Sequence, residues 1–141
     1  MATTRRAVTR WTGTLLEGSG ETTLASSGLG HFPVSWPSRS EEVSGKTSPE
    51  ELLAAAHASC FSMALASALA KGGTPATSLD TSVEVDFQPG QGVTAIRIAV
   101  SGDVPHLSHE DFTTAAEGAK ENCPISKALA AVPISLTTSA H

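Results

Sequence analysis

The chain has 141 residues, of which 40% are hydrophobic and 4% aromatic, and its formal net charge is −5. This length fits one domain with a modest aliphatic core, and the acidic balance excludes the basic surface that binds nucleic acid or an anionic membrane. No apolar run follows the basic start of the chain, so we expect no secretory signal and a cytoplasmic location.

The first third of the chain predicts a small β-sheet. Residues 5–16 and 22–24 are rich in β-branched and apolar side chains around glycine-containing turns, which predicts a hairpin. Residues 31–36 form a third short segment of this kind, which Pro33 restricts to a sheet edge or a loop. Residues 37–47 contain proline, serine, glycine and charges, and are expected to form an exposed loop.

A long helix is predicted from Ser48 to Lys71. Ser48 is a favourable N-cap, Pro49 suits the first helical position, and Glu51 completes a capping box. Gly72 follows the expected end of the helix. The segment approaches the length of a membrane span, but its alanine and serine content and its polar residues indicate a helix buried on most sides of a soluble protein.

The second half of the chain predicts a hairpin, two helices and a final strand. Residues 81–87 and 93–100 alternate apolar and polar side chains around a glycine-rich turn, which is the clearest hairpin signal in the chain. The elements expected after this hairpin, two helices and one strand, cover residues 108–120, 124–131 and 133–138. Because no repeat or linker divides the chain, this order predicts an α+β class in one domain over residues 1–141.

Cys60 and Cys123 are the first candidates for chemistry. In a reducing compartment, two cysteines far apart in a sequence are more often free thiols or a working redox pair than a permanent disulfide. Cys60 lies about three turns inside the predicted helix, where burial raises the pKa of a thiol, and this is also the setting of an inert core cysteine. Cys123 precedes Pro124 and would be a helix N-cap, where backbone amides favour a thiolate. Local electrostatics alone therefore ranks Cys123 as the better nucleophile.

Three polar residues near the cysteines are candidates for assisting them. Arg39, in the expected loop, could supply a cation or be a solvated surface residue. Glu50 suits the first turn of the helix, and about 15 Å of helical rise separates it from Cys60, so it reaches that thiol only through a bridging residue, a helix break or a second chain. His57, one turn before Cys60, could orient the thiol or be a satisfied core group.

Other functional patterns are missing from the sequence. The five histidines show no metal-ligand spacing, and there is no HExxH or CxxC motif. There is also no GxGxxG, P-loop or GxSxG motif, which leaves nucleotide binding and serine hydrolysis without support. We therefore expect no metal ion and no cofactor.

Two cysteine-containing segments are specific in combination. Residues 47–65 read TSPEELLAAAHASCFSMAL, and residues 122–129 read NCPISKAL. These segments strongly resemble the osmotically inducible protein C (OsmC) family of thiol peroxidases, and the likeness covers nearly the whole chain. His57, where the sister branch of organic hydroperoxide resistance proteins has a Gly-Tyr pair, favours the OsmC branch.

The resemblance implies both a fold and a site. The fold is one of antiparallel sheets around a central buried helix, in an intertwined homodimer with two sites at the interface. Cys60 becomes the peroxidatic cysteine and Cys123 the resolving one, which reverses the ranking from local electrostatics. Arg39 and Glu50 become the polar pair that activates Cys60, although other arginines compete for the role of Arg39, namely Arg5, Arg6 and Arg10.

The implied activity is the reduction of organic hydroperoxides and hydrogen peroxide. Cys60 would form a sulfenic acid, Cys123 would convert it to a disulfide, and an external dithiol would reduce the disulfide. The alternative is a non-enzymatic redox sensor or a protein that binds apolar ligands. A thioesterase-like activity has no specific acid or histidine constellation behind it.

Overall fold

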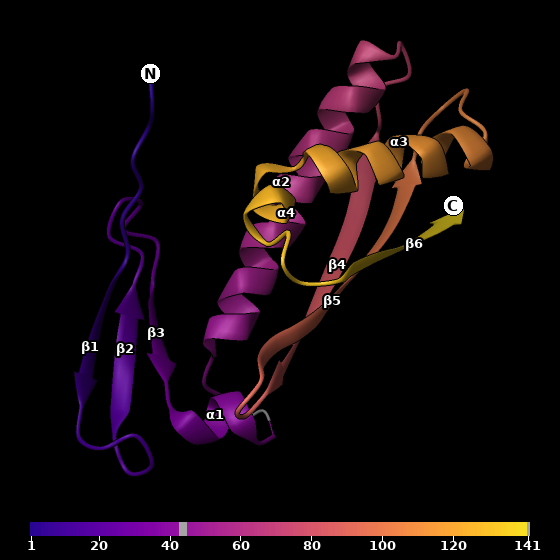
Figure 1. The fold of residues 1–141 in the computed structure, drawn as a ribbon. Coiled ribbons are helices and arrows are strands. Elements are labelled where there is room, and N and C mark those ends of the chain that lie inside the picture. Colours follow the sequence, from indigo (N-terminus) through magenta and orange to yellow (C-terminus); the bar gives the residue numbers. More distant parts are fainter. Residues whose placement is uncertain (43–44, 141) are drawn as a thin grey trace. The chain divides into compact units, whose positions relative to one another are not determined.

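The chain forms four helices and two three-stranded sheets over the residues that the computed structural model describes, which are 1–42 and 45–140 (Figure 1). The strands are β1 Val8–Thr12, β2 Ser19–Thr23, β3 His31–Val34, β4 Ser78–Gln88, β5 Gly92–Asp103 and β6 Ile134–Ala140. The helices are α1 Trp36–Ser40, α2 Pro49–Lys71, α3 His109–Asn122 and α4 Pro124–Ala128. The chain divides into two compact units, Met1–Leu52 and Leu53–His141, which are described in turn. The single domain over residues 1–141 stays a prediction.

The first unit contains the antiparallel sheet with strand order β1-β2-β3. Trp11 of β1 lies opposite Gly20 of β2, where an added Cβ would be 2.8 Å from the tryptophan ring, so a glycine is needed for this close approach. Pro33 lies in β3 at the edge of the sheet, which a proline tolerates because no inner ladder bond is lost. The predicted hairpin and the predicted edge strand are therefore confirmed.

A short helix, α1, lies where the sequence predicted an exposed loop, so that prediction is wrong for residues 37–40. Ser35 caps the helix, because its hydroxyl accepts from the Ser38 amide and the Ser38 hydroxyl accepts from the Ser35 amide. This capping box of two serines starts a helix in a segment whose proline and serine content had predicted a loop. Residues 43–44 of the predicted loop lie outside the described residues.

Helix α2 has the predicted bounds. The Ser48 hydroxyl accepts from the Glu51 amide at 3.1 Å, as an N-cap should, while the Glu51 carboxylate accepts from the Thr47 hydroxyl. By length and composition alone α2 is apolar enough to cross a membrane, a test that the core helix of a soluble protein also passes. Within the single chain α2 is buried along one face rather than on most sides, and side chains spaced by four residues line that face: His57, Phe61, Leu65 and Leu69.

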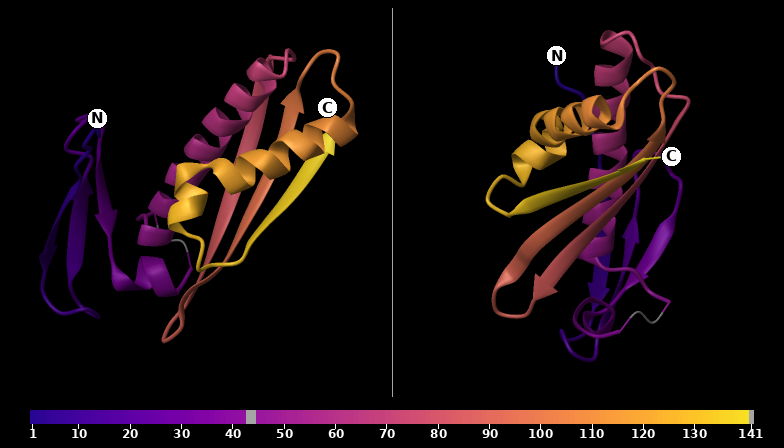
Figure 2. Two further views of the ribbon diagram at one scale, coloured as in Figure 1. Left: turned by 45° about the horizontal axis from the view of Figure 1, so that its top comes forward. Right: turned by 90° about the vertical axis from the view of Figure 1, so that its right-hand side faces the viewer.

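The second unit contains a sheet with strand order β4-β5-β6 (Figure 2). Strands β4 and β5 form the predicted antiparallel hairpin, although both are longer than expected. Strand β6 pairs in parallel with β5, because the chain passes through α3 and α4 before it returns to the sheet. The predicted α+β class is confirmed, but this second sheet is mixed rather than purely antiparallel.

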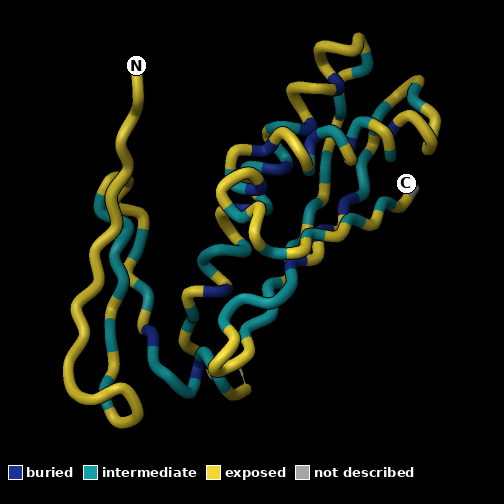
Figure 3. The backbone as a smooth tube through the Cα atoms, in the orientation of Figure 1, coloured by how far each residue is buried: buried dark blue, intermediate teal, exposed yellow. Residues whose placement is uncertain are grey.

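The hydrophobic core of the second unit lies between one face of this sheet and the two longer helices. Ile96, Ile98 and Val100 alternate along β5 with the exposed Arg97 and Ala99, so one face of the strand is apolar. The side chains that pack with this face come from α2 and α3, and include Phe61, Leu65, Leu69, Phe112, Ala116 and Ala119. In Figure 3 much of the tube coloured as buried lies along the helices and β5 of this unit. This core positions α2, which carries Cys60, and the end of α3, which is followed by Cys123.

Candidate active site

The two cysteines of the chain meet inside the second unit. Cys60 lies on α2, and Cys123 lies between α3 and α4, where its amide donates to the Ala119 carbonyl at 2.9 Å. The Cys123 carbonyl in turn accepts from the Lys127 amide at 3.0 Å, so the residue both ends α3 and begins α4. This double backbone role fixes the Cys123 side chain opposite α2.

The sulfur atoms of Cys60 and Cys123 are 2.8 Å apart and share a hydrogen bond. A disulfide bond is only about 2.04 Å long, and both cysteines are free thiols here. Cys123 is completely buried, with 0% of its surface exposed, whereas Cys60 is half-buried. A molecule from solvent therefore meets Cys60 before it meets Cys123.

The two thiols have opposite pKa shifts. Burial raises the pKa of the Cys60 thiol, and its hydrogen bond with Cys123 raises it further, against a smaller opposing effect of the Ile125 amide. Burial also acts to raise the pKa of Cys123, but hydrogen bonds from Cys60, from the Ser126 amide and hydroxyl and from the Ile125 amide together lower it. In the single chain Cys123 is thus the better thiolate, as the local electrostatics of its helix-cap position predicted.

His57 contacts the segment that carries Cys123. Its Nε2 lies 2.7 Å from the hydroxyl of Ser126 in α4, and both side chains are buried. Desolvation lowers the pKa of His57, so the imidazole is neutral near pH 7. The sequence left open whether His57 orients the Cys60 thiol or is a satisfied core group, and in the structure it is buried and contacts Ser126.

Arg39 and Glu50 form an ion pair inside the first unit. The Arg39 Nε donates to both oxygens of Glu50, at 3.0 and 3.3 Å, and Nη2 lies 2.9 Å from Oε1. The Ser38 hydroxyl donates to the Thr47 carbonyl at 2.9 Å, which joins α1 to the start of α2 and brings the two charged residues together. The Glu50 side chain is nearly buried, with 9% exposed, and that of Arg39 is 34% exposed. A guanidinium held in this way presents its N–H groups in a fixed orientation.

The predicted site residues thus form two pairs, Cys60 with Cys123 and Arg39 with Glu50. Arg5, one of the competing arginines, donates to the carbonyl of its neighbour Thr4. Among the residues that the structure describes, no three side chains of the metal-binding types gather around one point. Sequence reasoning assigned no role to Ser126, although its place three residues after an N-cap cysteine is where a side chain faces the cap.

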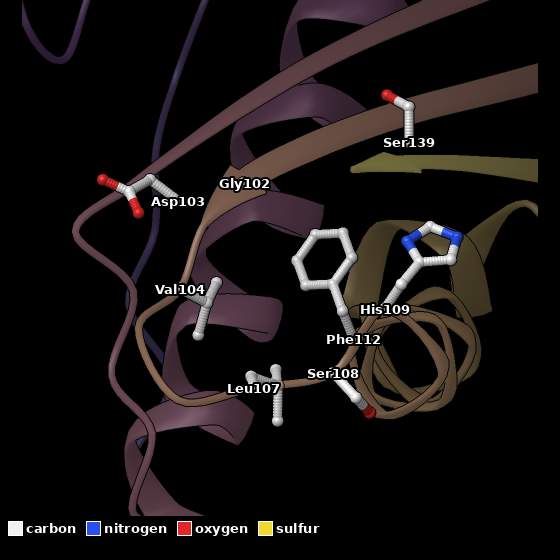
Figure 4. A pocket seen from close by; sticks show the side chains of 8 residues that line it. All are labelled: Gly102, Asp103, Val104, Leu107, Ser108, His109, Phe112 and Ser139. Carbon is white, nitrogen blue, oxygen red and sulfur yellow. The ribbon is translucent and has the colours of Figure 1, made fainter. Parts of the chain in front are cut away.

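A small cavity of about 150 Å³ lies elsewhere in the second unit, at the N-terminal end of α3 (Figure 4). The side chains around it include Val104, Leu107, His109 and Phe112, with Ser139 of β6 beside them. Cys123 follows the opposite end of this helix, and 14 helical residues span about 21 Å. This cavity is therefore separate from the thiols.

Fold and site together define a small α+β protein with two free thiols in contact. The family model described as OsmC-like protein matches residues 41–138. Peroxiredoxin OsmC of Escherichia coli (strain K12) is 35% identical over 130 residues, 90% of each chain, and Peroxiredoxin OsmC of Shigella flexneri matches to the same extent. The chain belongs to the OsmC family, as its two cysteine motifs predicted.

Solved structures share the fold. OhrB, an organic hydroperoxide resistance protein of Bacillus subtilis, superposes with a TM-score of 0.71 at 23% identity, over 97% of this chain and 98% of that one. An organic hydroperoxide resistance protein of Elizabethkingia anophelis has a TM-score of 0.72 at 21% identity and is covered completely, as is this chain. An OsmC-like protein of Mycoplasma pneumoniae has a TM-score of 0.73 at 13% identity, over 99% of both chains.

Proposed function

We propose that the protein is a cysteine-dependent peroxidase that reduces organic hydroperoxides, and hydrogen peroxide, through a Cys60 sulfenic acid and a Cys60–Cys123 disulfide. The observation that carries this proposal is the 2.8 Å separation of the two sulfur atoms. Two sulfur atoms at this separation can form a disulfide bond with little movement of α2 or α4. The relatives named Peroxiredoxin OsmC support the same chemistry.

Accessibility supports Cys60 as the residue that meets the peroxide. The peroxide must bring its O–O bond to the attacking sulfur, and Cys123 has none of its surface exposed. Cys60 is half-buried and is the thiol that a substrate can approach. The raised pKa of Cys60 means that this residue needs a cation to become a thiolate at neutral pH.

Arg39 is the proposed cation, and Glu50 holds it in place. The guanidinium would stabilise the Cys60 thiolate by its charge and orient the peroxide oxygens through its planar fork of N–H groups. The ion pair supports this role because a nearly buried carboxylate fixes the orientation of the fork. The position of Glu50 in the first turn of α2 stabilises its negative charge as well.

The proposed cycle balances with one external reductant. The Cys60 thiolate attacks one peroxide oxygen, the O–O bond breaks, and the leaving alkoxide takes a proton and departs as an alcohol. The Cys123 thiolate then attacks the sulfur of the sulfenic acid, the S–O bond breaks, and hydroxide leaves and is protonated to water. An external dithiol reduces the resulting disulfide by thiol exchange, which regenerates both thiols.

A cavity beside Arg39 supports the preference for organic peroxides. This cavity of about 330 Å³ lies in the first unit and has mostly apolar surroundings, which include Trp11, Leu15, Val34, Trp36 and Leu52. An apolar site of this kind binds the hydrocarbon group of an organic hydroperoxide, whereas hydrogen peroxide has only a hydrogen atom in that place. The expected order of substrates is therefore an organic hydroperoxide first and hydrogen peroxide second.

Exposed apolar surface supports the proposed homodimer. The hydrophobic core is formed by residues of the second unit, whereas Val34 is the one buried hydrophobic residue among the described residues of the first unit. Trp11 and Leu16 of that unit are exposed, and so is Met63 on the outer face of α2, at 72%. An uncovered sheet face and an uncovered apolar helix face need a partner, and a second copy of the chain supplies the same surfaces.

Turnover separates the proposed enzyme from a redox sensor. Purified protein mixed with tert-butyl hydroperoxide and a dithiol should consume many equivalents of peroxide per chain, and the reductants can be ranked by rate. A sensor would consume one equivalent per chain and stop, and that result would overturn the proposal. Two free thiols also fit the proposed cytoplasmic location, where the reductant pool keeps cysteines reduced.

A further inference from the structure

One buried titratable side chain, His57, is not used by the proposed cycle. None of its surface is exposed, its Nε2 lies 2.7 Å from the Ser126 hydroxyl, and its Nδ1 has no hydrogen-bond partner within the part of the chain that the structure describes. A buried N–H without an acceptor is costlier than a buried lone pair. The neutral ring therefore keeps its proton on Nε2 and donates it to Ser126.

Ser126 connects His57 to Cys123 through hydrogen bonds. The serine is buried and is the third residue of α4, and its hydroxyl is a hydrogen-bond partner of the cysteine that precedes the helix. Because its oxygen accepts from His57, its own hydrogen is free to bond the Cys123 sulfur, and this bond is among those that favour the thiolate. The result is a chain of donors that runs from the imidazole to the sulfur.

We propose that His57 is a positioning residue that acts through Ser126, and that this donor chain holds Cys123 as the thiolate that attacks the Cys60 sulfenic acid. The inference rests on the proposed function for the resolving role of Cys123. In that step the S–S bond forms as the S–O bond of Cys60 breaks, and the departing hydroxide leaves as water with the proton that Cys123 had released. Neither His57 nor Ser126 changes its net protonation over the step.

The surroundings of Cys123 leave few other groups that tune its thiol. Cys60 of α2 contacts the Cys123 sulfur directly, whereas His57, also on α2, contacts Ser126. The charged side chains nearby on α3 and α4 are engaged or exposed: Lys120 forms an ion pair with Glu117, and Glu121 and Lys127 are exposed. A change in the donor chain should therefore register directly in the Cys123 pKa.

The first experiment measures the Cys123 pKa without any peroxide chemistry. In a Cys60→Ser background, the ultraviolet absorbance of the single thiolate is followed against pH with and without His57→Leu. Loss of the donor chain should raise the Cys123 pKa by about one unit, a roughly tenfold smaller thiolate fraction near neutral pH. His57→Gln, which keeps an N–H donor, should recover most of this shift. An unchanged pKa in His57→Leu would overturn the proposal.

A second variant guards against a folding defect in His57→Leu. Ser126→Ala removes one hydroxyl from α4 and should raise the Cys123 pKa in the same direction. Ser62→Ala is the matched control, because its hydroxyl bonds Thr81 and the Ala58 carbonyl in the same unit, away from the thiols. Equal pKa values in Ser126→Ala and Ser62→Ala would also overturn the proposal.

The second experiment follows one equivalent of tert-butyl hydroperoxide with both cysteines present. His57→Leu and Ser126→Ala should form the sulfenic acid at the normal rate and the disulfide about tenfold more slowly than the Ser62→Ala control. Slowing of the first step alone, or of neither step, would contradict the inference. If the unaltered protein formed no disulfide, the proposed function would fail, while the pKa measurement would still decide whether the donor chain exists.

Discussion

Helix α2 leads to a prediction about how two chains share a site. The helix runs without interruption from Pro49 to Lys71, so the ten residue steps from Glu50 to Cys60 rise about 15 Å along its axis. A hydrogen bond spans only about 3 Å, so the Arg39–Glu50 pair that we propose to activate a given Cys60 should come from the partner chain. A folded monomer would then lack a complete site.

Mixing two inactive variants tests this arrangement. In a mixed dimer of Cys60→Ser and Glu50→Ala chains, one site joins the normal Cys60 of one chain to the normal Glu50 of the other, and the second site lacks both. Equal mixing gives mixed dimers in half of the population, each with one working site of two, so about a quarter of normal activity should return. Peroxide consumption after subunit exchange is the assay, with the exchange itself followed by native mass spectrometry.

The control replaces the neighbouring acid of the same helix. The Glu51 carboxylate accepts from the Thr47 hydroxyl, whereas the ion pair with Arg39 is formed by Glu50, so Glu51→Ala should be active before mixing. If Glu50→Ala and Cys60→Ser chains exchange completely and no activity returns, then each site draws both residues from one chain. In that case α2 would have to bend or break between Glu50 and Cys60, against its continuous form in this structure.

Variants at three positions probe the cation, the core and the surface charges. Arg39→Ala should raise the pH at which Cys60 is alkylated and slow the reaction with peroxide. Arg39→Lys should recover little of this loss, because an ammonium group does not replace the planar guanidinium. An unchanged alkylation profile would assign the role to another arginine. Ile98 is 1% exposed, so Ile98→Ala should lower the free energy of unfolding by about 2–5 kcal/mol in urea titrations, and a loss well below 1 kcal/mol would contradict the packing described for β5. Hydrogen bonds from Arg97 lower the pKa of Asp86 below its ordinary 3.8, so this pair stabilises the fold above that pH and the contribution is lost as the pH falls. Arg97→Met should therefore lose less stability than the unaltered protein between about pH 5 and pH 3, and parallel curves would show that this exposed pair contributes nothing.

Local patterns predicted most of the elements of this chain. The start of α2 followed from Ser48 and Pro49, and the β4–β5 hairpin followed from strict alternation around a turn, because both signals act over a few residues. The loop prediction failed at α1, where a serine capping box outweighed an irregular composition. The parallel pairing of β6 depends on which edge of the sheet the chain reaches after two helices, and no local pattern specifies that.

Only part of the site could be predicted from the sequence. The pKa directions of Cys60 and Cys123 followed from their helix positions, but the contact between their sulfurs depends on how α2 packs near the α3–α4 junction. The pairing of His57 with Ser126 joins residues 69 positions apart, and its signal in the sequence is no more than a polar residue on a buried helix face. Tertiary contacts of this kind follow from packing rather than from periodicity.

The central claim is that Cys60 attacks the peroxide and Cys123 resolves the product. One equivalent of tert-butyl hydroperoxide is added to the unaltered protein and to the Cys60→Ser and Cys123→Ser variants, and mass spectrometry identifies the oxidised cysteine in each. The account predicts a Cys60–Cys123 disulfide in the unaltered protein, a trappable sulfenic acid on Cys60 in Cys123→Ser, and unreacted peroxide with Cys60→Ser. Oxidation of Cys123 at the normal rate in Cys60→Ser would contradict the account and make the buried cysteine the nucleophile.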